Sequence, residues 1–321
     1  MNSLYQLVTE AHAAIRPQVR VTPLDYSPLL TLMTECEIYL KCEHLQHTGS
    51  FKFRGAVNKI RLLNQDARQN GVITASTGNH GQALALAARS AGIPVTVFAP
   101  VSAAQVKLDA IRAYGAQIEL VDGDALSAEL EAAKQATLQG KPFISPYNDK
   151  YIIAGQGTAG IEMVEQQPDL DAVFVSVGGG GLISGIGAAF KHLSPKTQII
   201  GCWPANATSM YASLKAGKII EIDEQETLSD GTAGGIEPGS ITFPLSQQVI
   251  DRYELVSEQE IRQAMRLIAR TDRWMIEGAA GVALAAALKI APEFKGKKIG
   301  VVLCGKNIVL EKFINAINDD E

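Results

Sequence analysis

Cysteine, aromatic residues and excess charge of either sign are all scarce in this sequence. Of 321 residues 4 are cysteines, 6% are aromatic and 20% are charged, and the formal net charge is −5. So small a charge excess excludes a disordered chain, and the lack of a basic bias argues against contact with a phosphate backbone. The hydrophobic content of 46% is that of an ordinary globular protein. We therefore expect no nucleic-acid partner.

Long apolar runs and metal-binding cysteine pairs are missing as well. The longest weakly charged stretch, residues 172–190, contains six glycines and would make a poor membrane helix. Residues 1–15 have apolar side chains at helical spacing, broken by Glu10 and His12, unlike a signal peptide. The cysteines form no CxxC and no Cys/His cluster at zinc spacing. These absences favour a cytoplasmic protein with reduced thiols, no membrane partner and no metal site.

Short β-branched segments alternate with longer segments of helical period, which is typical of βαβ units. One set predicts strands at 71–76, 93–99, 116–121 and 142–145, and helices at 79–90, 102–114 and 125–139. A second set predicts strands at 37–42, 172–177, 198–203 and 298–303, and helices at 158–166, 181–192, 209–215, 258–270, 278–288 and 308–317. Such patterns favour two open, twisted, mostly parallel sheets covered by helices, an α/β fold of two lobes. Ligands of such sheets bind at the carboxyl ends of the strands, and the irregular segment 221–248 is long enough to be functional.

A run of four glycines follows the predicted strand 172–177 and precedes a helix. Consecutive backbone amides at a helix N-terminus form an anion cradle, which suits a phosphate group. The run fits no GxGxxG pattern, and the chain has no GxxxxGK[ST], so a dinucleotide site and a P-loop are both disfavoured. The alternative is that these glycines only permit close packing of the helix on the strand.

Three further segments carry reactive side chains. Lys52 lies between two phenylalanines, where an apolar pocket would favour its neutral, nucleophilic form, although a lone lysine is more often a surface residue. Residues 75–81 (ASTGNHG) join a strand to a helix and suit either a bound carboxylate or simple N-capping. Cys304 ends another strand, where it would contact a cofactor or be a buried thiol.

Taken together and in this order, these segments resemble the fold-type II pyridoxal phosphate enzymes, and within them the threonine/serine dehydratase and serine racemase family. The resemblance covers nearly the whole chain. Its most specific stretches are EHLQHTGSFKFRGA at 43–56, STGNHGQA at 76–83, IAGQGT at 153–158, the glycines 178–181, and EGAAGVALA at 277–285. It implies a tryptophan synthase β-like fold, with pyridoxal 5'-phosphate between a large domain (1–68 and 149–321) and a small substrate-closing domain (69–148).

The resemblance also implies roles for individual residues. Lys52 would hold the cofactor covalently and act as the base at Cα, and Thr77 is the second catalytic candidate, because the racemases place a serine acid at its position. The cofactor-binding residues would be Phe51, Lys52, Asn79, Gly178, Gly179, Gly180, Gly181, Leu182 and Cys304. The residues expected to hold the substrate carboxylate are Ser76, Asn79, His80 and Gly81. A neutral thiol at the ring nitrogen makes the ring a milder electron sink, which favours β-elimination.

The implied reaction is dehydration and deamination of a 3-hydroxy amino acid, such as L-threonine or L-serine, to a 2-oxo acid and ammonia, by a cytoplasmic lyase that is a homodimer. Alternatives are a serine racemase on the same scaffold, a dehydratase of a larger hydroxy amino acid as in hydroxyectoine utilisation, a non-catalytic cofactor-binding sensor, and a nucleotide-binding protein. Many relatives bind a divalent cation, but Trp203 and Ser209 stand where its carboxylates are expected, so we predict no such site. Lys306 and residues 230–239 also depart from the family pattern and suggest a different or larger substrate.

Overall fold

The computed structural model describes residues 1–123 and 125–318 and contains two β-sheets. The larger sheet has six strands in the order β1-β2-β9-β6-β7-β8. Every neighbouring pair in it is parallel except β1 and β2, so the expected parallel sheet has one antiparallel edge. Its strands are β1 (Leu24–Tyr26), β2 (Glu37–Lys41), β6 (Ala172–Ser176), β7 (Gln198–Pro204), β8 (Arg252–Val256) and β9 (Lys298–Val302). The sequence pattern did not predict β1 and β8.

The smaller sheet has three parallel strands, β3 (Val72–Ala75), β4 (Val95–Pro100) and β5 (Gln117–Val121). The fourth strand predicted at 142–145 is wrong: these residues form an isolated bridge between Ile73 and Phe143. Pro142 has no N–H to donate, and Ser145 turns the chain by accepting from the amides of Tyr147 and Asn148. The pairing therefore ends after a few bonds.

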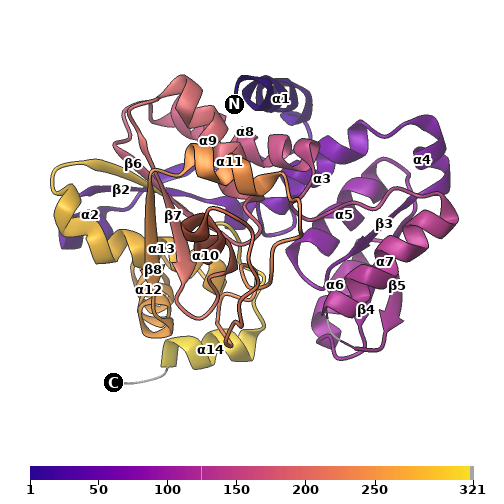
Figure 1. Ribbon diagram of the computed structural model, residues 1–321. Coiled ribbons are helices and arrows are strands. Elements are labelled where there is room, and N and C mark those ends of the chain that lie inside the picture. Colours follow the sequence, from indigo (N-terminus) through magenta and orange to yellow (C-terminus); the bar gives the residue numbers. More distant parts are fainter. Residues whose placement is uncertain (124, 319–321) are drawn as a thin grey trace.

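Helices cover both sheets, as Figure 1 shows. Two of them, α5 (Asn79–Ser90) and α7 (Ala125–Gln139), have the predicted bounds. The others are α1 (Asn2–Ile15), α2 (Pro28–Thr34), α3 (Lys52–Arg61), α4 (Gln65–Asn70), α6 (Gln105–Ala113), α8 (Lys150–Gln166), α9 (Gly181–Leu193), α10 (Ser209–Ala216), α11 (Thr242–Val249), α12 (Glu258–Thr271), α13 (Gly278–Ile290) and α14 (Leu310–Asn318), with 3-10 turns at Glu43–Leu45 and Ala291–Phe294. No helix in residues 1–123 and 125–318 has the length and hydrophobicity needed to cross a bilayer.

Helix α8 begins a full two turns before the predicted start. Its N-cap is Asp149, whose carboxylate accepts from the amides of Tyr151 and Ile152 at 2.7 and 3.2 Å. The glycines in its first half do not break it. A Cβ on Gly155 would lie 2.6 Å from the carbonyl oxygen of Arg54, so this glycine lets α8 pack against α3. The segment 221–248 is likewise less irregular than expected, because its last part forms α11.

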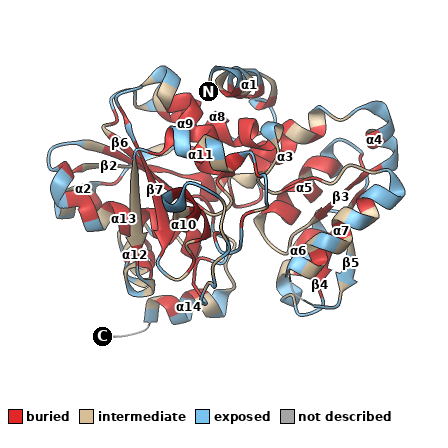
Figure 2. Ribbon diagram, viewed as in Figure 1, coloured by how far each residue is buried: buried red, intermediate tan, exposed pale blue. Residues whose placement is uncertain are grey.

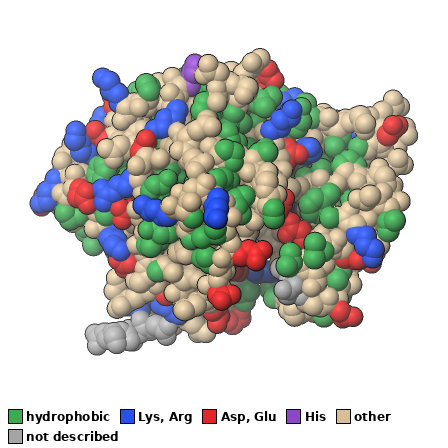
Figure 3. All heavy atoms as spheres, in the orientation of Figure 1, with side chains coloured by type: hydrophobic (Ala, Val, Ile, Leu, Met, Phe, Trp, Pro, Cys, Tyr) green, Lys and Arg blue, Asp and Glu red, His purple; other side chains and the backbone are tan. Residues whose placement is uncertain are grey.

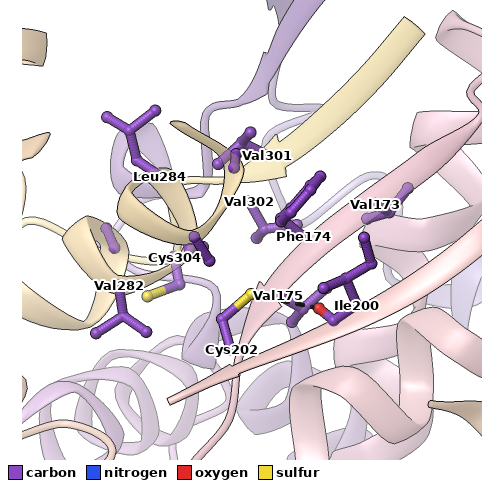
Figure 4. Packing of buried hydrophobic residues seen from close by; sticks show 14 of the residues in the cluster. Val173, Phe174, Val175, Ile200, Cys202, Val282, Leu284, Val301, Val302 and Cys304 are labelled. Carbon is purple, nitrogen blue, oxygen red and sulfur yellow. Dashed lines mark hydrogen bonds between the residues drawn. The ribbon is translucent and has the colours of Figure 1, made fainter. Parts of the chain in front are cut away.

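The main hydrophobic core lies between the six-stranded sheet and its helices, shown in red in Figure 2. Phe174 of β6, Ile200 of β7 and Val301 of β9 are fully buried in it. Figure 4 shows these side chains packed together with Cys202 and Cys304. All four cysteines are buried and free. The strands are therefore apolar on both faces, as central parallel strands are.

A buried ion network fixes α3 against α8 and β2. Arg54 donates to the carboxylates of Glu43 and Glu162 at 2.7–2.8 Å, and Lys41 donates to Glu162 at 2.7 Å. All four side chains are essentially inaccessible to solvent. Arg54 lies two residues after Lys52, so the network holds the start of α3 in place.

Candidate active site

A cavity of about 1270 Å³ opens between the two sheets. Three strands end at it: β3 leads into the turn 76–80, β6 into the glycine run, and β9 into Cys304. Figure 3 shows acidic side chains beside the hollow between the two halves of the molecule. The structure brings together in this cavity every predicted site residue except Gly81, which lies in the adjoining first turn of α5.

Lys52 is the first residue of α3, and its Nζ lies in the cavity. The ammonium group donates to the carbonyl oxygen of Pro146 at 2.8 Å and lies 5.2 Å from the ring centroid of Phe51. Burial lowers the pKa of Lys52 to about 8, and the neighbouring Cys304 and Glu277 act in the opposite direction. Roughly a tenth of this lysine is therefore uncharged at pH 7, far more than at an ordinary lysine pKa, and the uncharged amine is the form that a nucleophile or base requires.

The glycine run forms a turn whose amides are free. Gly180 has φ +81° and caps α9, and the amides of residues 181–183 donate to no acceptor within the described part of the chain. The same glycines also permit close packing. A Cβ on Gly178 would lie 2.8 Å from the backbone of Thr232, and one on Gly179 would clash with the ring of Tyr147. Close packing is therefore present, and the phosphate site at this run stays a prediction.

The turn before α5 does not cap its helix with side chains. Gly78 is the N-cap, without a side-chain hydrogen bond, and the Ser76 hydroxyl accepts only from the amide of Gly78, at 3.2 Å. Thr77 lines the cavity beside it. A Cβ on Gly81 would lie 2.7 Å from the carbonyl oxygen of Ser76, so the turn needs glycine there. The amides of the first turn of α5 thus stay available to a ligand.

His80 is 2% exposed and lies 3.2 Å from the carbonyl oxygen of Ile144 through Nε2. Burial, with the charge of Lys52 nearby, lowers its pKa to about 3, so the ring is neutral. Because a carbonyl only accepts, Nε2 carries the proton and Nδ1 is left as an acceptor. Nδ1 has no partner within the described residues.

Glu277 is a site residue that the sequence analysis quoted within a motif but gave no role. Its carboxylate accepts from the Asn79 amide at 2.8 and 3.1 Å and from the backbone amide of Asn307 at 3.0 Å. The Asn79 oxygen accepts in turn from Asn307 Nδ2 at 2.6 Å. Burial raises the pKa of Glu277 to about 7. The one local sequence signal for Glu277 is its position, as an acidic residue directly before the apolar helix α13.

Cys304 follows β9 by two residues and lies beside the end of the neighbouring strand β6. Its Sγ accepts from the Ser176 hydroxyl at 3.6 Å and lies 4.0 Å from a carboxylate oxygen of Glu277. Burial and that negative charge raise the pKa of the thiol well above its usual value. The thiol is therefore neutral.

Other cavity residues were not predicted. Tyr147 packs over the glycine run, and its hydroxyl accepts from the amide of Glu237 at 3.2 Å. Lys107 of α6 pairs with Asp230 at 2.9 Å and so links the helices of the small sheet to the segment 221–241. Glu129 of α7 also lines the cavity. These contacts join residues far apart in the chain and have no local sequence signature.

Comparisons with known proteins show the family of this chain. A family model described as pyridoxal-phosphate dependent enzyme matches residues 15–305. The L-threonine ammonia-lyase of Thermotoga maritima is 41% identical over 312 residues, which cover 97% of this chain and 77% of that protein. The beta-hydroxyaspartate dehydratase of Paracoccus denitrificans is 38% identical over 96% of this chain and 97% of its own length. The structure of processed threonine deaminase isoform 2 from Solanum lycopersicum superposes with a TM-score of 0.94 at 33% identity, covering 98% of this chain and 92% of that one.

Proposed function

The chain belongs to the pyridoxal-phosphate-dependent enzyme family and is a lyase of the threonine dehydratase type, and from this premise we propose how its site works. The substrate is a 3-hydroxy amino acid such as L-threonine or L-serine. The enzyme removes water and then ammonia, leaving a 2-oxo acid. The observation that carries the proposal is the convergence in one cavity of a lysine with a lowered pKa, a free amide cradle and a neutral thiol.

The residues of the cavity fit pyridoxal 5'-phosphate. Lys52 would hold it covalently, the amides of residues 178–182 would bind its phosphate, and Phe51, Asn79 and Cys304 would surround its ring. When bound, the cofactor supplies an electron sink for negative charge at Cα. The neutral Cys304 thiol would leave the ring nitrogen unprotonated, which moderates that sink and favours loss of a β-substituent.

Lys52 has a second role in this proposal, as the base at Cα. Its pKa of about 8 leaves an uncharged amine available near neutral pH, since burial disfavours the ammonium form. The carbonyl of Pro146 orients Nζ by accepting its hydrogen bond. Proton removal thus depends on the apolar surroundings of the amine.

The turn before α5 would bind the substrate carboxylate. Ser76 offers a hydroxyl, and Asn79, His80 and Gly81 offer the backbone amides of the first helical turn. His80 contributes through its amide rather than its ring, because Nδ1 is an acceptor. Nδ1 of His80 can still accept a hydrogen bond from a donor group of the substrate.

We also propose the domain boundaries, the oligomeric state, the cellular location and the metal requirement of the enzyme. Residues 1–68 and 149–321 form the large domain and 69–148 the small one, which carries the whole three-stranded sheet and closes over the substrate. The enzyme works as a cytoplasmic homodimer without a divalent cation. Glu224 supports the absence of the cation, because it is the carboxylate beside Ser209, where a ligand would be expected. Its oxygens already accept from the hydroxyl and amide of Ser209 at 2.5 and 2.9 Å and from the amide of Gly234 at 2.7 Å.

The test is an absorbance scan of the purified holoenzyme while L-threonine, L-serine and their D-forms are added in turn, with 2-oxo acid measured in parallel. Oxo acid from an L-hydroxy amino acid supports the proposal. A spectral change without oxo acid contradicts it and favours a racemase or a cofactor-binding sensor.

A further inference from the structure

The charged side chains of the cavity are predominantly acidic. It is lined by six carboxylates, Glu129, Glu221, Asp223, Asp230, Glu237 and Glu277, and by two lysines, Lys52 and Lys107. Lys107 is paired with Asp230, and Lys52 is assigned to the cofactor. No arginine is among the described residues that line it. A negative potential therefore remains where the substrate side chain must lie.

Two of these carboxylates, Glu129 and Glu237, line the cavity from different lobes. Glu129 is half-buried on α7, and Glu237 belongs to the segment that follows α10. Burial raises the pKa of Glu129, and the negative charge of Glu237 raises it further. Tyr147 lies near both carboxylates. Like charges brought together in a closing cavity favour a cation between them.

Unpartnered polar atoms indicate that a polar ligand completes this cavity. One oxygen of Glu237 accepts from Asn148 at 2.8 Å, whereas the other, Oε1, is buried without a partner within the described part of the chain. His80 Nδ1 and Gln156 Nε2 are also without partners there, on side chains 2% and 1% exposed that line the same cavity. Buried polar groups in proteins are nearly always hydrogen-bonded, so such atoms mark a place for a ligand.

We propose that the cavity takes a 3-hydroxy amino acid whose side chain carries an ammonium group beyond Cβ, and that Glu129 and Glu237 bind this group. The inference rests on the proposed ammonia-lyase function and specifies its substrate class. An ammonium offers three donors, which suits the free oxygen of Glu237 and the facing carboxylate. A second carboxylate on the substrate would instead meet negative charge and no arginine.

The first experiment measures binding apart from turnover. The probes are L-2,4-diaminobutyrate, L-2-aminobutyrate and L-aspartate, none of which has a β-hydroxyl. At Cγ the first carries a positively charged ammonium, the second is an uncharged methyl group, and the third is a negatively charged carboxylate. Each is titrated into the holoenzyme and followed by the absorbance of the bound cofactor and by thermal stabilisation. We expect diaminobutyrate to bind at least about tenfold more tightly than aminobutyrate, the size of effect of a hydrogen-bonded ion pair, and aspartate to bind most weakly.

Variants test whether the two named carboxylates are responsible. Glu129→Gln and Glu237→Gln each reduce the preference for diaminobutyrate over aminobutyrate about tenfold and leave aminobutyrate binding within about twofold. Glu131→Gln is the matched control on the same helix, because Glu131 bonds Lys134 and Gln135 outside the cavity. It keeps the full preference.

The hydroxylated series then gives turnover. L-Threonine, L-threo-3-hydroxyaspartate and L-threo-3-hydroxy-2,4-diaminobutyrate carry the same leaving group and differ in charge at Cγ, and we expect kcat/KM to be highest for the last. Equal binding of the three analogues, or tightest binding of aspartate, overturns the inference. The proposed ammonia-lyase function is still supported in that case if threonine is turned over. If none of the hydroxy amino acids yields oxo acid, the proposed function fails, and the binding series still decides whether the acidic wall selects an ammonium.

Discussion

The side-chain amide of Asn79 donates to both carboxylate oxygens of Glu277, at 2.8 and 3.1 Å. Asn79 begins α5, beside the three-stranded sheet, whereas Glu277 precedes α13, which packs on the six-stranded sheet. This contact links the two lobes at the wall of the cavity. The carboxylate that makes it has a pKa of about 7, so its charge changes within the physiological range.

Glu277 makes the stability of the apo-protein depend on pH. Because its pKa is about 7 when folded and near 4.5 when unfolded, the folded chain binds more protons between these values. Its contribution is fully present below about pH 4.5 and is lost as pH rises toward and beyond 7. The wild type should therefore lose roughly 3 kcal/mol relative to Glu277→Gln between pH 4.5 and 8. Denaturant unfolding of both proteins across this range measures the difference, and parallel curves would show that Glu277 keeps an ordinary pKa.

Lys52→Ala should abolish covalent attachment of the cofactor and lower turnover at least about a thousandfold, since the nucleophile and the base are both removed. Borohydride reduction followed by peptide mass spectrometry reads the attachment independently of activity. In the wild type the mass of one cofactor should appear on the peptide that contains Lys52, and its uptake should accelerate as pH rises through about 8. The exposed Lys134→Ala is the control. Attachment at another lysine would disprove the assignment.

Gly179→Ala should weaken cofactor binding about tenfold or more, because the added methyl group would clash with the ring of Tyr147. Equilibrium titration of the apo-protein with pyridoxal 5'-phosphate measures the effect. The double variant Gly179→Ala/Tyr147→Ala removes the ring and should recover part of the loss. If the single variant binds normally, the ring moves freely and the close approach has no role.

Arg54→Met should destabilise the protein by about 3–5 kcal/mol, since it leaves two buried carboxylates without their main partner. Both Glu43 and Glu162 are almost inaccessible to solvent. Arg112→Met is the matched substitution in an exposed pair with Asp109 and should cost less than about 1 kcal/mol. Urea unfolding compares the two, and similar losses would contradict the importance of the buried network.

Thr77→Ala tests whether the Thr77 hydroxyl supplies a proton on the side opposite Lys52. We expect the wild type to form pyruvate from L-serine together with a smaller amount of D-serine, and the variant to retain pyruvate formation within about tenfold while losing D-serine. Chiral chromatography of the products measures both. Absence of D-serine from the wild-type reaction, or its persistence in the variant, would remove this role from Thr77.

The sequence by itself determined the elements whose signals are local. The helices at 79–90 and 125–139 and the central strands follow from hydrophobic period and from flanking glycines, so their places could be predicted. The glycine run favoured a phosphate site through its local backbone, whereas Lys52 between two phenylalanines was by itself more typical of a surface residue. The motifs added a family resemblance, which implied the cofactor.

The tertiary structure decided what depends on contacts between distant residues. The helix predicted at 158–166 starts earlier, at Lys150, and contains Gly155 and Gly157, where α3, α1 and α9 pack closely against it. The pKa values of Lys52 and Glu277 arise from burial that only the closed fold provides. Glu129 and Glu237 likewise line one cavity although they are about a hundred residues apart in the chain. Charge, burial and hydrogen-bond partners depend on distance in space, and the order of residues along the chain does not state that distance.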